Sequence, residues 1–250
     1  MAARQIFSFP SSKAISDTLD AHIAVLSAKA IASSGKFTIA VSGGSLPTIL
    51  AATLKSNTTI DFSKWHLFYA DERCVPLDHA DSNHLAVQRA LLDHVPIPAA
   101  HVHTLTASLA PAEAAKRYEQ DLRAVFGDVA LPEFDLILLG VGPDGHTCSL
   151  FPDHPLLDVK DRWVAHLLDS PKPPPARITL TYPVVNNAET VIFVATGAGK
   201  QDMFHDMFDK GVDFPSGRVT ARKNLFWFLD EPAAVKVSAR STEAGGRTTA

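Results

Sequence analysis

The stretch FDLILLGVGPDGHTCSLFPDHP, residues 134–155, constrains the fold more than any other part of the chain. Its apolar run 136–140 is short and uncharged, which is typical of a strand buried on both faces of a parallel sheet. A loop with two glycines follows and places Asp144 and His146 two residues apart. Ligands bind at the carboxyl edge of open α/β sheets, where such a loop lies. We therefore expect an ordered loop that presents Asp144 and His146 to a pocket.

Further strands alternate with helices along the chain. The apolar patterns predict strands at 36–41, 65–70, 177–181 and 190–196, with 163–168, 226–229 and 235–237 as weaker candidates. They predict helices at 11–34, 47–54, 81–92 and 111–126, and another that starts at 197–200. This alternation favours an α/β fold with a mostly parallel sheet. The rigid run 171–175 leads directly into a strand, so we expect a fixed loop within a single domain, residues 1–240, before a flexible tail, 241–250.

Composition excludes several classes of partner. The net charge is −4 and there is no basic run, so we expect no nucleic-acid binding. No window approaches 18 apolar residues and the N-terminus lacks a signal-peptide pattern, so we expect no membrane association. Two cysteines, Cys74 and Cys148, show neither a disulfide framework nor metal-ligand spacing, which suits a reducing compartment. We expect a cytoplasmic protein that is a monomer or a weak homo-oligomer.

A glycine-rich turn between the first strand and its helix has the character of a phosphate site. Ser42, Gly43, Gly44 and Ser45 fill this turn. Glycines let the backbone approach an anion closely, and the amides at a helix N-terminus favour negative charge. A plain turn between strand and helix remains the alternative. Lys200, at the start of another helix, is unfavourable for the helix dipole unless an anion lies there too.

Charged residues follow a third strand at the same expected edge. Asp71, Glu72 and Arg73 come directly after the strand 65–70. A solvated turn is the ordinary alternative for such a triplet. Arg177 could reach the same pocket, or it could form an ion pair at the sheet edge. Hydroxyls, amides and cations suit a phosphate, and Asp144 with His146 suits proton transfer. The residues thus indicate an enzyme without a cofactor or metal that acts on a small phosphorylated substrate.

Five motifs, spread over residues 10–240, strongly resemble 6-phosphogluconolactonases. In chain order they are VSGGSLP, YADERCVPLDHADSNH, GVGPDGHTCSLFP, PKPPPARITLTYPVVNNA and VATGAGK. The resemblance implies a Rossmann-like three-layer fold shared with glucosamine-6-phosphate deaminases. It implies hydrolysis of 6-phosphoglucono-δ-lactone to 6-phosphogluconate, the second step of the oxidative pentose phosphate pathway. One departure is Cys148, where alanine is expected more often.

The resemblance also implies roles for individual residues. His146 looks like the general base that activates water, since an unperturbed histidine has a pKa of about 6.5. Asp144 would orient the site, and Arg73 would stabilise the charge that develops on the carbonyl oxygen. Gly43, Gly44, Ser45, Arg177 and Lys200 look like the phosphate cradle. The remaining candidate substrate contacts are Ser42, Asp71 and Glu72.

Two other functions stay open. A glucosamine-6-phosphate deaminase shares SGGS and DGH, but such enzymes follow DGH with a segment ending in glutamate, and residues 147–152 lack one. A non-catalytic sugar-phosphate sensor would keep the pocket without turnover. The presence of both Asp144 and His146 argues against a sensor, and a lactonase assay discriminates directly.

Overall fold

A six-stranded sheet, parallel throughout, forms the centre of the protein in the computed structural model, which describes residues 2–238. The strand order is β1-β9-β8-β5-β2-β3. The bounds of these strands are β1 Arg4–Phe9, β2 Phe37–Val41, β3 Trp65–Tyr69, β5 Leu136–Leu139, β8 Thr190–Ala195 and β9 Asn224–Asp230. Four of the six follow predicted runs closely, and β9 extends the predicted run 226–229 at both ends.

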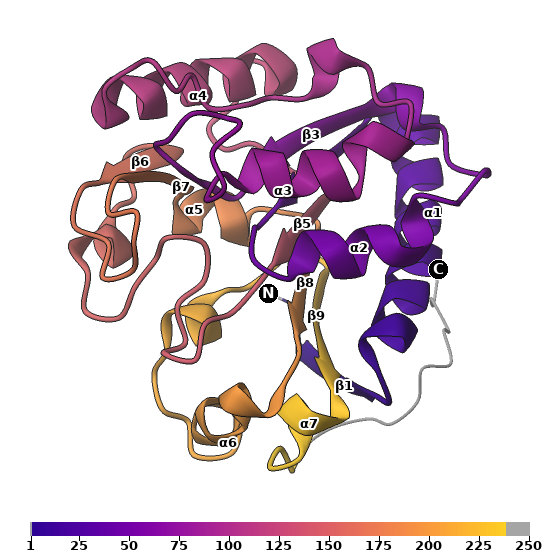
Figure 1. The fold of residues 1–250 in the computed structure, drawn as a ribbon, viewed down its shortest axis with the longest axis vertical. Coiled ribbons are helices and arrows are strands. Elements are labelled where there is room, and N and C mark those ends of the chain that lie inside the picture. The colour runs from indigo at the N-terminus through magenta and orange to yellow at the C-terminus, as the bar shows by residue number, and fades with distance from the viewer. Residues whose placement is uncertain (1, 239–250) are drawn as a thin grey trace.

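Helices cover both faces of this sheet, which gives the expected three layers. Figure 1 shows α1 and α2 on one side of the sheet, with β6, β7, α5 and α6 on the other. Side chains alternate accordingly along β2, where Ile39 and Val41 pack with the helix layer of α1 and Ala40 packs on the opposite face. The helices are α1 Ser12–Ser34, α2 Leu46–Leu54, α3 Asn83–Ala90, α4 Pro111–Phe126, α5 Tyr182–Asn186, α6 Gln201–Phe208 and α7 Glu231–Ala234.

The long helix α1 has the caps that its sequence predicts. The Ser11 side chain accepts a hydrogen bond from the amide of Ala14, and Gly35 ends the helix in the left-handed region, at φ 77°. Ile15, Leu19 and Ile23 are fully buried beneath it. No helix among residues 2–238 is both long and apolar enough to cross a membrane.

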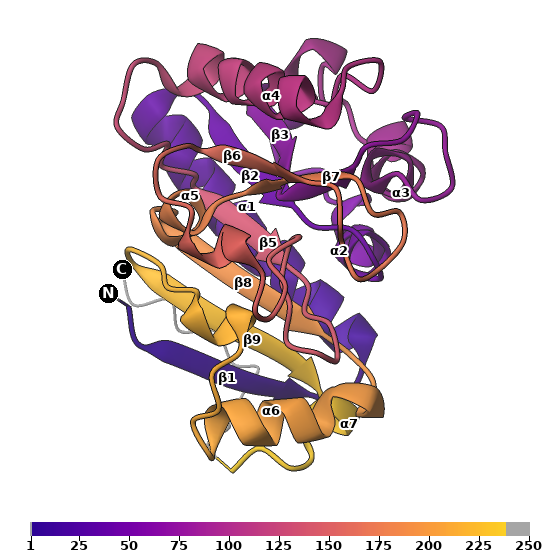
Figure 2. The same ribbon diagram turned by 90° about the vertical axis from the view of Figure 1, so that its left-hand side faces the viewer.

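A second, antiparallel sheet of three strands lies beside the large one (Figure 2). Its order is β4-β7-β6, with bounds Asp71–Arg73, Arg177–Leu180 and Val164–Leu167. In this sheet Arg73 is paired with Arg177. The charged triplet 71–73 is therefore a strand and not a solvated turn. Because a single residue separates β4 from the end of β3, this sheet starts at the carboxyl edge of the parallel sheet.

At the ends of the chain, one strand was missed and one predicted strand was wrong. Residues 4–9 form the edge strand β1, which was not predicted and which pairs with β9. The predicted strand 235–237 is absent, because the Asp230 side chain caps α7 through the amide of Ala233 and the chain turns away. The place beside β9 is taken by β1. The tail predicted at 241–250 lies outside the described residues.

Candidate active site

A pocket of about 240 Å³ opens at the carboxyl edge of the parallel sheet. Its walls come from the loops after β2, β5 and β8 and from strands β4 and β7. All the predicted site residues except Asp144 and Glu72 line it, namely Ser42, Gly43, Gly44, Ser45, Asp71, Arg73, His146, Arg177 and Lys200. The strand ends thus meet as the parallel arrangement requires.

The turn from β2 into α2 depends on its glycines. A Cβ on Gly43 would lie 1.8 Å from the side-chain oxygen of Asn83, so only glycine fits against α3. Gly44 has a φ of 72°, which glycine adopts without strain. Ser45 makes no side-chain cap on α2. The turn therefore presents the amide end of α2 to the pocket, as a phosphate-binding turn does.

The loop after β5 folds back on itself and fixes the imidazole of His146. The Gly142 amide donates to the backbone oxygen of His146 (2.9 Å), and a Cβ on Gly142 would lie 2.1 Å from the ring. The ring stacks on Phe151 with a centroid distance of 4.7 Å. Its Nδ1 lies 2.5 Å from Oδ1 of Asp144. These contacts leave His146 Nε2 without a hydrogen bond among residues 2–238.

Opposing influences act on the proton affinity of this pair. Burial lowers the pKa of His146, the Asp144 carboxylate opposes this shift, and the nearby charge of Lys172 reinforces it. Burial alone would raise the pKa of Asp144, but its bonds to His146 and Lys172 outweigh that effect, and the pKa is lowered. An ionised Asp144 beside a neutral His146 is the state that general-base catalysis needs.

The two arginines of the pocket, Arg73 and Arg177, differ in the number of hydrogen bonds that each guanidinium donates. Arg177 is buried and donates from Nε to the oxygen of Pro174 and from Nη2 to the oxygens of Lys172 and Pro173, at 2.8–3.2 Å. Arg73 donates from Nη1 to the backbone oxygen of Asp81 (2.8 Å). Its buried Nε has no hydrogen-bond partner within residues 2–238. Arg177 thus holds the loop 172–174, whereas the Arg73 guanidinium has a single hydrogen bond, to Asp81, among residues 2–238.

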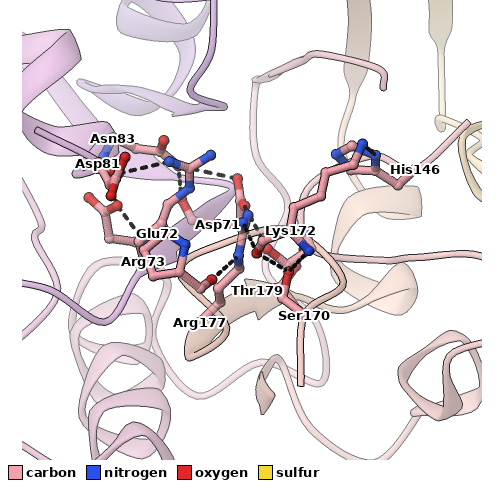
Figure 3. Close-up of polar contacts among 12 residues, drawn as sticks. Asp71, Glu72, Arg73, Asp81, Asn83, His146, Ser170, Lys172, Arg177 and Thr179 are labelled. Carbon is pink, nitrogen blue, oxygen red and sulfur yellow. Dashed lines mark hydrogen bonds and ion pairs between the residues drawn. The ribbon is translucent and has the colours of Figure 1, made fainter. Parts of the chain in front are cut away.

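Asp71 lines the pocket, is buried, and forms hydrogen bonds with neighbouring residues. Its Oδ2 accepts from the Ser149 hydroxyl at 2.7 Å and lies 3.9 Å from Nη1 of Arg177. Asn83 donates to its backbone oxygen at 2.8 Å. Asp71 therefore links β4, α3 and the segment that follows His146. Figure 3 shows Asp71 beside Asn83 and Arg177.

Comparisons with known proteins agree with this geometry. The family model for glucosamine-6-phosphate isomerases/6-phosphogluconolactonase matches residues 10–227. The chain belongs to this family. The rat 6-phosphogluconolactonase is 47% identical over 206 residues, 80% of each chain. A probable 6-phosphogluconolactonase of Schizosaccharomyces pombe is 42% identical over 250 residues, 94% of this chain and 97% of the relative. The crystal structure of the 6-phosphogluconolactonase from Thermotoga maritima has a TM-score of 0.81 and 28% identity, and the match covers 91% of this chain and 100% of that one.

Within this family, the segment after His146 bears on the choice between isomerase and lactonase. Residues 147–152 bring no carboxylate to the pocket. The Ser149 hydroxyl is committed to Asp71, and Leu150 and Phe151 are buried in the core. The ring-opening chemistry that uses a glutamate in this segment therefore lacks its residue here.

Glu72 was expected to contact the substrate, but it is a structural residue. Its carboxylate is buried and accepts hydrogen bonds from the amides of Arg73, Asn83 and His84 at 2.7–2.8 Å. Burial raises the pKa of Glu72, and these amide bonds counteract part of the shift. It does not line the pocket. Glu72 instead satisfies the first amides of α3, as a capping carboxylate does.

Two residues that line the pocket, Lys172 and Asn83, were not among those predicted from the sequence. Lys172 reaches Asp144 and His146 from the proline-rich loop, with Nζ at 3.0 Å and 3.1 Å from their nearest atoms. Asn83 fits against Gly43 and binds the backbone of Asp71. Both residues lie in motifs that resemble 6-phosphogluconolactonases, Lys172 in PKPPPARITLTYPVVNNA and Asn83 in YADERCVPLDHADSNH, and this was the available signal.

Cys148 is buried, as expected for a side chain packed inward, but it also lines the pocket. Burial raises the pKa of its thiol well above the ordinary value. The thiol therefore stays protonated near neutral pH and is a poor nucleophile.

Proposed function

We propose that the chain hydrolyses 6-phosphoglucono-δ-lactone to 6-phosphogluconate in the oxidative pentose phosphate pathway, with His146 as general base. The observation that carries this proposal is the 2.5 Å contact between His146 Nδ1 and Asp144, beside a pocket lined by cations and the Ser42–Ser45 turn. The lactonase relatives of the family support the same reaction.

The geometry indicates how the proton moves. With the Nδ1 proton kept on the ring and hydrogen-bonded to the Asp144 carboxylate, the lone pair of Nε2 is available to a water molecule. Nε2 takes a proton as the water oxygen bonds to the lactone carbonyl carbon, and the carbonyl electrons move to its oxygen. Arg73 stabilises that oxyanion. When the intermediate collapses, the bond to the ring oxygen breaks, and the imidazolium returns its proton to that oxygen.

The phosphate group is assigned to the Ser42–Ser45 turn and to Lys200. The ammonium of Lys200 lines the pocket and has one hydrogen bond, to the backbone oxygen of Thr196 (3.0 Å), among residues 2–238. Burial lowers the pKa of Lys200, against the influence of Asp230. A bound dianion would restore the stability of its charged form. Arg177 contributes to the phosphate only through Nη1, since its other donors hold the loop 172–174.

Substitution of Lys200 tests this assignment. Lys200→Ala should raise the KM for the phosphorylated lactone by about 10–100-fold, because a charge-assisted hydrogen bond to a phosphate is lost. Its effect on unphosphorylated glucono-δ-lactone should be small. Lys55→Ala, at an exposed position outside the pocket, serves as the control. Equal effects of Lys200→Ala on both substrates would assign Lys200 to structure.

An assay of the purified protein tests the reaction itself. We expect lactone hydrolysis above the spontaneous rate, at a rate unchanged by EDTA or 1,10-phenanthroline. His146 acts as the base only while its Nε2 lone pair is free of a metal. Among residues 2–238, no three histidine, cysteine or acidic side chains are placed to hold a metal ion. Loss of activity on chelation and its return with one stoichiometric metal would overturn the role of His146.

Three further expectations from the sequence are retained as proposals. We infer a cytoplasmic location, while noting that some plant relatives are named as chloroplastic. We infer a monomer or a weak homo-oligomer. We also infer that residues 1–240 act as one domain, since the pocket takes residues from both sheets.

A further inference from the structure

Lys172 contacts both members of the proposed catalytic pair. Its Nζ lies 3.0 Å from Asp144 Oδ1 and 3.1 Å from His146 Nδ1. The same carboxylate oxygen and the same ring nitrogen form the 2.5 Å contact between Asp144 and His146. The three groups therefore meet at a single point, on the side of the imidazole away from Nε2.

The backbone of Lys172 is fixed independently of its side chain. Its oxygen accepts from the Ser170 hydroxyl and from Nη2 of Arg177, both at 2.8 Å. Its amide donates to the Ser170 hydroxyl at 3.2 Å. Figure 3 shows Lys172 between Arg177 and His146, with its side chain extending toward His146. The buried Arg177 thus holds the position from which the lysine reaches the pair.

This arrangement bears on which nitrogen of His146 carries the proton. Asp144, whose Oδ1 lies 2.5 Å from Nδ1, is the acceptor that holds a proton on this nitrogen. Lys172, 3.1 Å from Nδ1, is a cation without an acceptor, so it does not itself favour a proton there. Asp144 by itself would also favour a second proton, on Nε2, because an imidazolium beside a carboxylate is stabilised. The ammonium opposes that second proton by repulsion. Asp71, on β4, is a further charged group near His146, and its negative charge raises the pKa of the imidazole.

We propose that Lys172 is a positioning residue that keeps His146 neutral by opposing a second proton, while Asp144 holds the remaining proton on Nδ1 and leaves Nε2 free to act as a base. This role rests on the proposed function of His146. Lys172 donates a hydrogen bond to the same Asp144 oxygen that accepts from Nδ1–H, and so fixes its position. Its charge offsets the tendency of that carboxylate to make the imidazole cationic.

Titration of His146 in the unliganded protein, followed by nitrogen-15 NMR of the ring, tests this role directly. Lys172→Met removes the charge and keeps the length of the side chain. We expect the pKa of His146 to rise by about one unit, since a unit charge is lost from hydrogen-bond distance. A general base works only when unprotonated, so the acid limb of kcat/KM should move to higher pH by the same amount.

Matched variants separate this role from structural effects. Lys172→Arg keeps the charge and should restore most of the wild-type titration, whereas Lys172→Gln should behave as Lys172→Met does. Lys55→Met changes the net charge equally at an exposed position outside the pocket and should leave His146 unaltered. A rise in KM with an unmoved His146 titration would overturn the proposal. A shifted titration in a protein without lactonase activity would instead refute the proposed function and leave the effect of Lys172 intact.

Discussion

His146→Ala lowers kcat for the phosphorylated lactone by about 10²–10⁴-fold, the usual cost of losing a general base, and leaves the fold intact. The fold should survive because the ring lies at the pocket and, among residues 2–238, makes polar contacts with Asp144 and Lys172 only. After the substitution those two side chains still pair with each other at 3.0 Å. No buried charge is therefore left without a partner.

The measurement combines steady-state kinetics with circular dichroism on the purified variant. His94→Ala is the matched control, because His94 is exposed and does not line the pocket. Asp144→Asn should also lower kcat, since an amide that accepts less strongly no longer selects the tautomer with the proton on Nδ1. Near wild-type turnover in His146→Ala, with a normal spectrum, would remove His146 from the mechanism.

Glu72→Ala lowers the free energy of unfolding by about 3–5 kcal/mol, a cost in the range for breaking buried charge networks. Glu72 is 1% exposed, and its carboxylate accepts from three backbone amides and from the Ser82 hydroxyl. Alanine would leave these donors without partners at the start of α3. Because Asn83 in the same turn fits against Gly43, the predicted phosphate-binding turn should loosen as well.

Urea denaturation of the variant measures this loss. Glu72→Gln keeps the volume and one acceptor oxygen, so its stability should lie between those of the wild type and Glu72→Ala. Glu113→Ala, at an exposed ion pair in α4, should remain close to the wild type. If Glu72→Ala were as stable as Glu113→Ala but had a raised KM, Glu72 would have to be returned to the substrate contacts.

Continuous apolar runs determined the central strands from the sequence alone. The runs that became β2, β5 and β8 are almost entirely apolar, so the sequence does not suggest a strand or helix with one polar face. All three strands are buried on both faces in the structure. Parallel strands end at one edge, so the loops with Ser42, His146 and Lys200 had to meet there. The family resemblance of their motifs was likewise legible in the sequence, and the family is confirmed.

The sequence alone did not predict elements whose structure depends on residues far away along the chain. The strand β1 is mixed in polarity, and its pairing with β9 joins opposite ends of the chain. The triplet 71–73 became a strand because β7 pairs with it. The sequence placed Glu72 and Arg177 near the pocket, but it did not show that their donors and acceptors are engaged by α3 and by the loop 172–174.

Lys172 shows the same limit within the site itself. Sequence placed a lysine in a rigid proline-rich loop, and only the antiparallel pairing of β7 with β4 and β6 brings that loop to His146. The local sequence determines the spacing of apolar residues, the turns and the helix caps, because these features depend on neighbouring residues along the chain. The pairing of charges depends on which segments meet across the fold, and hydrogen bonds of about 3 Å between residues far apart in sequence are decided only when the whole core packs.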